Sequence, residues 1–308
     1  MIYDLIIIGA SAAATAAGIY AARRRLNFII VSKDIGGEVA TSGEVENYPG
    51  FAKTSGIELS EKFKEHLAEN QVIPETVVDV KNIKKEETKF ILEAEKDNKP
   101  VTYEAKSVII ATGVKPRKLN IPGEEEFEGK GVSYCTVCDG PLFKEKIVAT
   151  IGGGSSALES ALMLSQIATK VYLITVNPEM KGETTLIEKT KAADNVEIVT
   201  NTKTTKIIGE QTVTGLEYQN KDNQETKNLK VDGIFVHIGM IPNSQMADLA
   251  EKNKFREIVV DRLGKTNIEG LFAAGDVTDT PYKQIAIATG MGTTAALSVV
   301  DYLNKLKE

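Results

Sequence analysis

The sequence has no surplus of basic residues. Its 308 residues include 37 lysines and arginines against 43 aspartates and glutamates, which gives a formal net charge of -6. A protein that binds nucleic acid without regard to sequence needs a basic surface to neutralise phosphates. An anionic membrane surface likewise attracts clusters of lysine and arginine. The charge balance therefore argues against nucleic acid and against a membrane surface as partners.

Long apolar runs and a leader pattern are also missing. No apolar run approaches the roughly 20 residues needed to span a bilayer. The start of the chain, residues 1–4, has no basic stretch of the kind that opens a signal peptide and leads directly into a predicted strand. We therefore expect a cytoplasmic protein without membrane contact. Structural disulfides are rare in that compartment, so the only two cysteines of the chain need another explanation.

Two segments of the chain follow the same plan. Residues 4–9 and 146–152 are apolar runs that end in glycine, and each is followed by a stretch that predicts a helix. Strands that are apolar throughout are typical of parallel strands buried on both faces. Each copy continues with alternating, strand-like segments and closes on another apolar strand, residues 108–113 and 234–239, with a proline three residues after its glycine. The halves therefore predict two related domains, as the length also suggests.

The tail of the sequence does not begin a third copy. Residues 270–276 predict one more buried strand, and residues 285–306 predict a final helix, and such a pair must dock on an existing sheet. We therefore predict an α/β protein with two Rossmann-like, three-layer ββα nucleotide-binding domains, the second inserted into the first. The first would comprise residues 1–114 and 243–308, and the second residues 115–242.

Each repeated strand leads into a candidate phosphate-binding turn. Such a turn needs small residues, because the backbone must approach the pyrophosphate and the helix must pack close to the strand. The N–H groups at the start of the helix then face the phosphates. Gly152, Gly154 and Ala157 fit this pattern well. The first copy has Ser11 in place of the middle glycine, between Gly9 and Ala14, and the serine hydroxyl offers a hydrogen bond to a phosphate.

In each half of the chain, the end of the second predicted strand lacks the residues that usually bind the ribose of a dinucleotide. An acidic residue normally binds the ribose 2′-OH there, whereas arginines bind the 2′-phosphate of NADPH. Residues 31–34 and 174–179 have no acid directly at the strand end, and the second segment has no arginine. The pattern mildly favours NADH over NADPH.

Cys135 and Cys138 are separated by two residues, just before the second phosphate-binding strand. A pair at this spacing can close a small disulfide ring, and the start of a helix makes a thiol more reactive. Redox catalysis is the favoured interpretation, with Asp139 as proton donor or acceptor or as a helix cap. Three alternatives stay open: a zinc site, although only His66 and His237 could add imidazole ligands; a structural disulfide that closes a very short loop; and two inert buried thiols.

The motifs together resemble the low-molecular-weight thioredoxin reductases over the whole length of the chain. The resemblance is carried by residues 36–39, 44–51, 111–113, 135–140, 152–154 and 274–277. The second half is also similar to the flavoprotein subunit of alkyl hydroperoxide reductase, through residues 138–143, 178–181 and 281–284.

This resemblance implies FAD in the discontinuous domain and NAD(P)H in the inserted one. Hydride would pass from the nicotinamide to the flavin, which would reduce the cysteine pair. Cys138 would face the flavin, Cys135 would attack the disulfide of the partner, and Asp139 would handle the proton. The flavin site would comprise Gly9, Ser11, Ala12, Gly37, Glu38, Asn47, Val80, Ala111, Thr112, Gly113, Gly275, Asp276, Lys283, Gln284 and Ile285. The nicotinamide pyrophosphate would lie on Gly152, Gly154, Ser155 and Ser156.

The implied partner is thioredoxin or a thioredoxin-like or glutaredoxin-like protein, and the implied assembly is a homodimer whose inserted domain rotates during turnover. The sequence departs from the family pattern at Ser11, at Glu38 in place of a glutamine, and at Val176 and Asn177 in place of arginines. A carboxylate near the flavin would disfavour its anionic reduced form unless it were neutralised. Two other functions stay open: a reductase that takes its electrons from ferredoxin, and a flavin-binding redox sensor without turnover.

Overall fold

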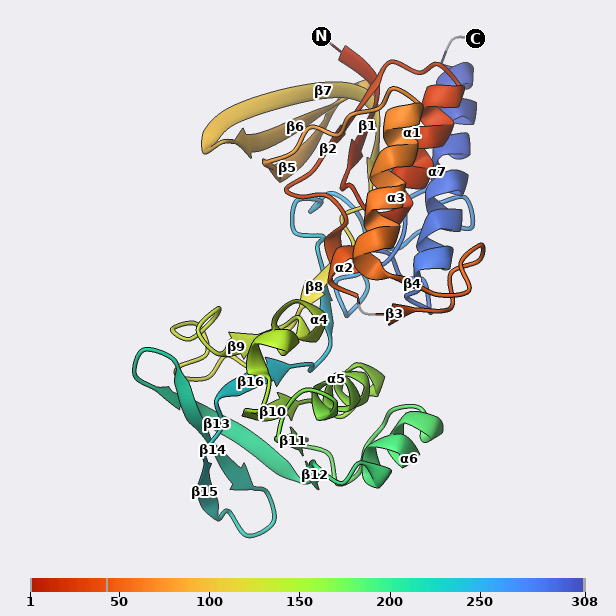
Figure 1. The fold of residues 1–308 in the computed structure, drawn as a ribbon. Coiled ribbons are helices and arrows are strands. Elements are labelled where there is room, and N and C mark those ends of the chain that lie inside the picture. Colours follow the sequence, from red (N-terminus) through yellow and green to blue (C-terminus); the bar gives the residue numbers. More distant parts are fainter. Residues whose placement is uncertain (1, 43, 307–308) are drawn as a thin grey trace. The chain divides into compact units, whose positions relative to one another are not determined.

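The computed structural model describes residues 2–42 and 44–306, and these divide into two compact units. One unit contains the residues up to Lys115 together with those from Ile241 onward, and the other is Pro116–Met240. The second unit therefore interrupts the first along the chain (Figure 1). The borders between these two units lie one to two residues from the predicted domain borders. The assignment of a cofactor to each unit stays a prediction.

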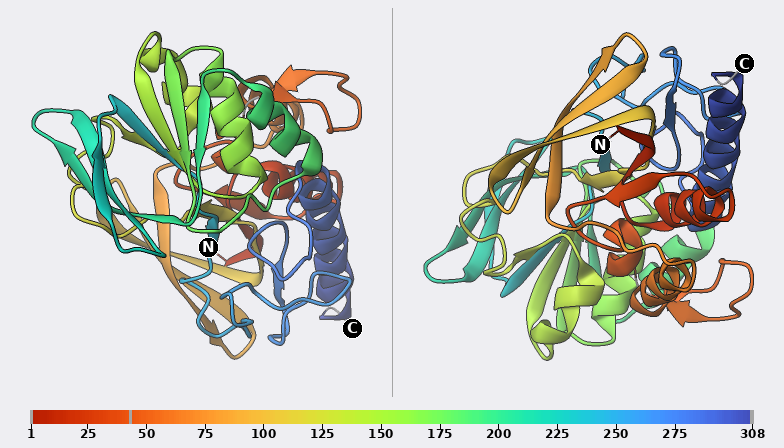
Figure 2. Two further views of the ribbon diagram at one scale, coloured as in Figure 1. Left: turned by 90° about the horizontal axis from the view of Figure 1, so that it is seen from below. Right: turned by 90° about the horizontal axis from the view of Figure 1, so that it is seen from above.

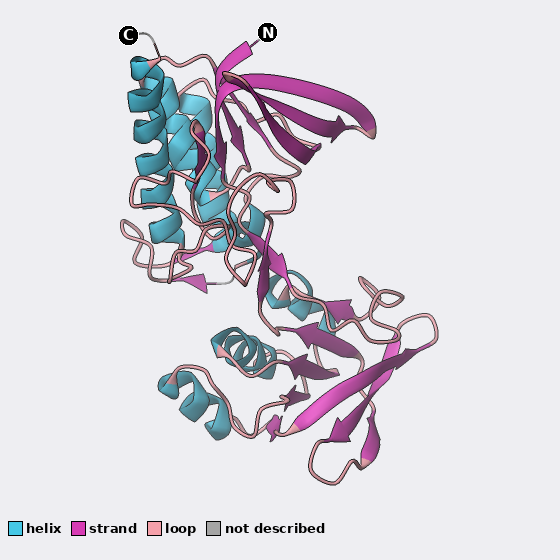
Figure 3. Ribbon diagram, turned by 180° about the vertical axis from the view of Figure 1, so that it is seen from behind, coloured by secondary structure: helices cyan, strands magenta, loops and turns pink. Residues whose placement is uncertain are grey.

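The first unit is built on a single sheet, and its long strand β7 belongs to both a parallel and an antiparallel part of that sheet. The carboxyl half of β7 pairs in parallel with β1 and β18, whereas its amino half pairs in antiparallel with β6. The long strand thus joins a parallel core to an antiparallel hairpin (Figure 3). The strand order is β2 (Phe28–Val31), β1 (Ile2–Ile8), β7 (Lys99–Ile110), β6 (Lys89–Lys96) and β5 (Val78–Glu86), and β18 (Leu271–Ala273) also pairs with β7.

Both faces of the parallel core are buried, which explains why the second half of β1, from Leu5 to Ile8, is apolar. Leu5 and Ile7 pack into the cluster on the helical face, and Ile6 and Ile8 pack into the cluster on the opposite face. Helices cover the first of these faces (Figure 2). The helices are α1 (Ala12–Arg23), α3 (Gly56–Glu69) and α7 (Ile285–Lys305), and the short elements α2 (Gly37–Thr41), β3 (Glu44–Val45) and β4 (Thr54–Ser55) lie between β2 and α3 in the chain.

Helix α7 corrects one expectation from the sequence. Among the described residues it is the one helix long and apolar enough to cross a membrane by length and composition. The core helix of a globular protein passes the same test, and α7 packs against α1 through buried residues such as Ala295, Ala296 and Val299. About a third of this apolar stretch is buried, so the core of the first unit accounts for part of its apolar character.

The second unit has the three-layer arrangement predicted for it. Its parallel sheet has the order β12 (Val196–Val199), β11 (Lys170–Ile174), β10 (Ile147–Ile151), β16 (Gly233–Val236) and β9 (Val132–Ser133). Helices α5 (Ser155–Ser165) and α6 (Thr184–Ala192) cover one face. A three-stranded antiparallel sheet, β13 (Thr202–Gly209), β14 (Val213–Asn220) and β15 (Thr226–Leu229), covers the other. The predicted α/β class with Rossmann-like sheets is confirmed.

Two short elements matter for the candidate site. Helix α4 (Thr136–Asp139) follows β9 and runs directly into a 3₁₀ turn, Gly140–Phe143. The two chain segments that connect the units, β8 (Val114–Pro116) and β17 (Met240–Pro242), pair with each other as a two-stranded sheet.

The contact between α1 and α7 yields a prediction on stability. A Cβ on Gly292 would lie 2.0 Å from the carbonyl oxygen of Ala13, whereas a Cβ on Gly290, two residues earlier in the same helix, would meet nothing within 4 Å. We expect Gly292→Ala to destabilise the first unit by about 1–3 kcal/mol through overpacking. Gly290→Ala is the matched control, and we expect it to be neutral or stabilising by about 0.5–1 kcal/mol because alanine favours helix. Thermal unfolding followed by circular dichroism compares the two; equal midpoints would contradict the close packing.

Candidate active site

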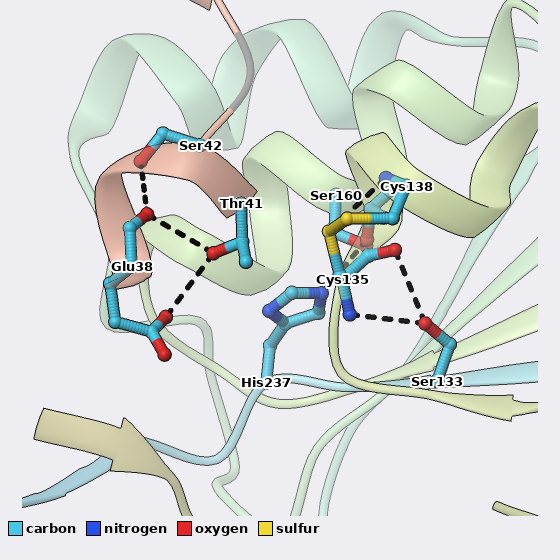
Figure 4. Close-up of a disulfide and its surroundings, with 9 residues drawn as sticks. Glu38, Thr41, Ser42, Ser133, Cys135, Cys138, Ser160 and His237 are labelled. Carbon is cyan, nitrogen blue, oxygen red and sulfur yellow. Dashed lines mark hydrogen bonds between the residues drawn. A yellow bond between two sulfur atoms is a disulfide. The ribbon is translucent and has the colours of Figure 1, made fainter. Parts of the chain in front are cut away.

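Cys135 and Cys138 form a disulfide at the start of α4 (Figure 4). Their Cα atoms are 5.4 Å apart, and the structure describes no free cysteine. No group of three or more metal-ligating side chains occurs within residues 2–42 and 44–306. Of the sequence alternatives, the two inert thiols are therefore wrong, and the predicted bonding of the pair at a helix start is confirmed.

The backbone around Cys135 is held by short hydrogen bonds. The N–H of Cys138 donates to the sulfur of Cys135 at 3.1 Å. The hydroxyl of Ser133 accepts from the N–H of Cys135 at 3.0 Å and donates to its carbonyl oxygen at 3.2 Å. An N–H that points at a sulfur favours its thiolate form once the disulfide is reduced. Once the pair is reduced, the local geometry therefore favours a thiolate on Cys135 rather than on Cys138.

A buried row of hydroxyl groups lies beneath the disulfide. The hydroxyl of Thr136 is 2.7 Å from that of Ser160 on α5 and 2.9 Å from Nε2 of His237, which follows β16. Ser160 is in turn 3.3 Å from the hydroxyl of Thr150 on β10. Thr136, Ser160 and Thr150 are all buried. From the sequence, His237 was a candidate only as a metal ligand, and this row was missed because its members are far apart in the chain.

Burial lowers the pKa of His237 from its ordinary value of 6.5 to about 4. Removal of the imidazole from water disfavours its charged form. His237 is therefore neutral near pH 7, so one ring nitrogen donates and the other accepts. A neutral ring matches the neutral hydroxyl of Thr136.

The first phosphate-binding turn is closed against a neighbouring strand. Gly9 has a φ of +115°, and a Cβ there would lie 2.2 Å from the carbonyl oxygen of Ala111. The hydroxyl of Ser11 donates to the carbonyl of Gly36 at 2.5 Å. In this structure the proton of Ser11 thus serves the loop that carries Gly37, and a contact of Ser11 with a phosphate stays a prediction.

A buried carboxylate oxygen at the end of β18 has no partner in the protein. Oδ1 of Asp276 is shielded from water and accepts no hydrogen bond from the described residues. Burial raises the pKa of Asp276, and the nearby Lys283 opposes that rise. A buried polar atom without a partner is costly, so a ligand hydroxyl is expected to satisfy it.

Glu38 lies in the same unit as this carboxylate. Burial raises its pKa, a hydrogen bond from Thr41 lowers it, and the charges of Asp34 and Asp276 raise it further. A raised pKa moves Glu38 towards the neutral form. This is the condition under which a glutamate at this position is compatible with an electron-rich ligand.

Other predicted flavin residues are brought together in the first unit. The amide of Asn47 donates to that of Gln284 at 3.2 Å, although the two are 237 positions apart. Thr112 donates to the carbonyl of Asn243 at 2.6 Å. Val80 is buried in the sheet core, so only its backbone is available to a ligand. The remaining members lie at strand ends or helix starts of this unit: Ala12, Gly37, Ala111, Gly113, Gly275, Lys283 and Ile285.

The second phosphate-binding turn lies at the start of α5. A Cβ on Gly152 would lie 2.1 Å from the carbonyl oxygen of His237, whereas Gly154 faces open space. The hydroxyl of Ser155 accepts from the N–H of Glu183 at 3.1 Å, and Ser156 is exposed. The ammonium of Lys221, on the turn after β14, donates to the carbonyl of Val176. The sequence patterns did not reveal this cation at the end of β11, because it comes from a turn 45 residues further along the chain.

Comparison with known proteins identifies the family. The model for pyridine nucleotide-disulphide oxidoreductases matches residues 3–292. The chain belongs to this family. Membership implies a flavin and a pyridine nucleotide, and it makes the protein an oxidoreductase with Cys135–Cys138 as its redox-active disulfide.

Individual relatives carry different names. The structure of Lactococcus lactis thioredoxin reductase superposes with a TM-score of 0.91 at 32% identity, covering 98% of this chain and 99% of that one. The predicted resemblance to thioredoxin reductases is thereby confirmed. A subunit of the alkyl hydroperoxide reductase of Staphylococcus aureus is 43% identical over 302 residues, which are 98% of this chain and 59% of the relative. A protein named NADH dehydrogenase from Ferdinandcohnia aciditolerans is 40% identical over 302 residues, 98% of this chain and 57% of the relative. The chain thus spans less than two thirds of these two curated relatives.

The titration of His237 yields a prediction on stability. In the unfolded chain a histidine takes up its proton near pH 6.5, whereas folded His237 does so only near pH 4. Its contribution to the free energy of unfolding is therefore complete above about pH 6.5 and is lost as the pH falls from there towards 4. We expect the wild type to lose more stability than His237→Gln between about pH 7 and about pH 4.5. Urea unfolding at several pH values measures this difference; parallel curves would show that His237 titrates normally.

The unpartnered oxygen of Asp276 yields a prediction on cofactor binding. We expect Asp276→Ala to weaken retention of flavin by roughly tenfold or more, because a hydrogen bond to a charged group contributes about 1.5–3 kcal/mol. The control is Asp301→Ala, which removes the same charge from an exposed position on α7. Flavin retained after gel filtration, read from its visible absorbance, provides the measurement. Equal retention by the two variants would show that Asp276 does not contact the flavin.

Proposed function

We propose that the protein is an NAD(P)H-dependent, FAD-containing reductase of thioredoxin or of a thioredoxin-like or glutaredoxin-like protein. The observation that carries this proposal is the Cys135–Cys138 disulfide at the start of α4, with the sulfur of Cys135 already hydrogen-bonded to an N–H. A stabilised thiolate on Cys135 is the nucleophile that attack on a second disulfide requires. The likeness to the Lactococcus thioredoxin reductase over nearly the whole of both chains supports the choice of substrate class.

The first unit would hold the FAD and the second the nicotinamide nucleotide. Asp276 would accept a hydrogen bond from a flavin hydroxyl, and the turn at Gly9 would admit the pyrophosphate to the start of α1. The turn at Gly152 and Gly154 would do the same for the nucleotide at the start of α5. When bound, the flavin supplies two-electron chemistry between a nicotinamide and a disulfide.

Asp139 closes α4 and lies beside the redox pair. It lines a hollow of about 340 Å³ together with Ser133, Leu142 and Phe143. The side chain of Leu142 is 76% exposed. Asp139 would exchange the proton as Cys135 and the leaving thiol change charge.

NADH is the favoured donor. Val176 and Asn177 offer no positive charge at the end of β11, and both the N–H and the amide of Asn177 bond to the hydroxyl of Thr175. Lys221 is the cation that reaches this edge, and it is bonded to the carbonyl of Val176. An exposed lysine binds a 2′-phosphate more weakly than the paired arginines of NADPH sites do.

The assembly and the compartment are part of the same proposal. We propose a cytoplasmic homodimer whose units rotate relative to each other during turnover. The Staphylococcus aureus relative is named for an alkyl hydroperoxide reductase, which is a peroxide-reducing system.

Anaerobic titration with NADH and NADPH, followed through the flavin absorbance, tests the proposal. We expect NADH to bleach the flavin at a lower concentration than NADPH. We also expect Cys135→Ser to keep this reduction but to lose turnover with an oxidised thioredoxin, because Cys135 is the attacking thiol. The wild type measured in parallel, for bleaching and for turnover, is the control.

Each other outcome has a definite meaning. A preference for NADPH would overturn the choice of donor. No bleaching by either nucleotide would favour ferredoxin as donor. Bleaching without turnover in the wild type would favour a redox sensor, and a protein that neither holds nor takes up FAD would overturn the whole mechanism.

A further inference from the structure

The residue that follows the first cysteine is tied to the sheet and to a helix of the second unit. Thr136 is the first residue of α4, and its side chain is 5% exposed. Its hydroxyl contacts Ser160 on α5 at 2.7 Å and Nε2 of His237 beyond β16 at 2.9 Å. Figure 4 shows His237 and Ser160 beside the disulfide. The helix that carries the redox pair is thus attached through one hydroxyl to two different elements.

These contacts depend on one another. A buried hydroxyl without a partner costs about 1–3 kcal/mol. Ser160 is buried and also lies 3.3 Å from the buried hydroxyl of Thr150 on β10. Any movement of α4 away from the sheet would therefore leave several polar groups unpaired at once. The ring of His237 is neutral near pH 7, so it bonds to Thr136 without the cost of a buried charge.

The consequence concerns the reduced protein, in which no covalent bond restrains the pair. A disulfide closes more readily when its two thiols are already held close together, because less conformational freedom is lost on closure. An anchor at Thr136 that persisted after reduction would keep the two thiols near the 5.4 Å Cα separation of the disulfide.

We propose that His237 is a positioning residue for the redox pair: through the hydroxyl of Thr136, which Ser160 also contacts, it holds α4 in place after reduction, and it thereby makes the Cys135–Cys138 disulfide harder to reduce. This inference rests on the redox role of the two cysteines given above. It assigns to His237 neither metal binding nor proton transfer to substrate.

The test is the equilibrium of the cysteine pair with dithiothreitol. In this reaction the Cys135–Cys138 bond breaks, the protein gains two electrons and two protons, and dithiothreitol loses both and closes its own disulfide. The purified protein, with any flavin it holds, is equilibrated anaerobically with mixtures of reduced and oxidised dithiothreitol. Its free thiols are then counted with a maleimide reagent, and the count is clean because the chain has only two cysteines.

We expect the cysteine pair of His237→Ala to be half reduced at a ratio of reduced to oxidised dithiothreitol about three to ten times lower than in the wild type. The reason is that a net hydrogen bond contributes about 1 kcal/mol. A tenfold change corresponds to about 30 mV. His237→Gln is the matched control, because its amide keeps a donor and an acceptor, and we expect it to stay within about twofold of the wild type. Thr136→Val has nearly the shape of threonine without the hydroxyl, so it provides the same test should His237→Ala fold poorly.

The outcomes separate this inference from the proposed function. If the wild type exchanges with dithiothreitol but Thr136→Val and His237→Ala do so at the same ratio, or at a higher one, the positioning role of His237 is wrong and the reductase proposal is unaffected. An equal shift in His237→Gln would mean that shape alone matters and would also overturn it. A wild-type pair that does not exchange would overturn the redox role itself, and the inference with it.

Discussion

In each unit, the first glycine of the phosphate turn presses against the carbonyl oxygen of a neighbouring strand end. A Cβ on Gly9 would lie 2.2 Å from the oxygen of Ala111, and one on Gly152 would lie 2.1 Å from that of His237. Only glycine permits this approach at a positive φ. The contact lies just before the start of α1 in the first unit and of α5 in the second, and a helix start is where a dinucleotide phosphate can bind.

In the second unit the same contact connects the predicted nucleotide turn to the support of the disulfide. The backbone of His237 meets the turn at Gly152, and its side chain meets Thr136 at the start of the redox helix. One residue thus touches both the nucleotide turn and the support of the disulfide. The link is local, because every residue in it belongs to Pro116–Met240.

The departures from the family pattern acquire physical explanations in the structure. Ser11 bonds to the carbonyl of Gly36 and so ties the first turn to the loop before α2. Burial and the neighbouring charges of Asp34 and Asp276 raise the pKa of Glu38, against a hydrogen bond from Thr41 that lowers it. Both substitutions are therefore compatible with a flavin site, which the family membership of the chain also implies.

The sequence by itself determined the features that depend on local pattern. Apolar strands such as residues 4–9 and 146–152, the glycines that follow them and the spacing of Cys135 and Cys138 predict the α/β class, the repeated plan and the bonded pair, because each signal lies within a few residues. Long-range contacts could not be read in this way. The hydroxyl row of Thr136, Ser160 and Thr150, the approach of Lys221 to Val176 and the unpartnered oxygen of Asp276 depend on which strands and helices become neighbours. Only the tertiary structure decided them, because burial and hydrogen bonding between distant residues arise from packing and leave no pattern in the chain.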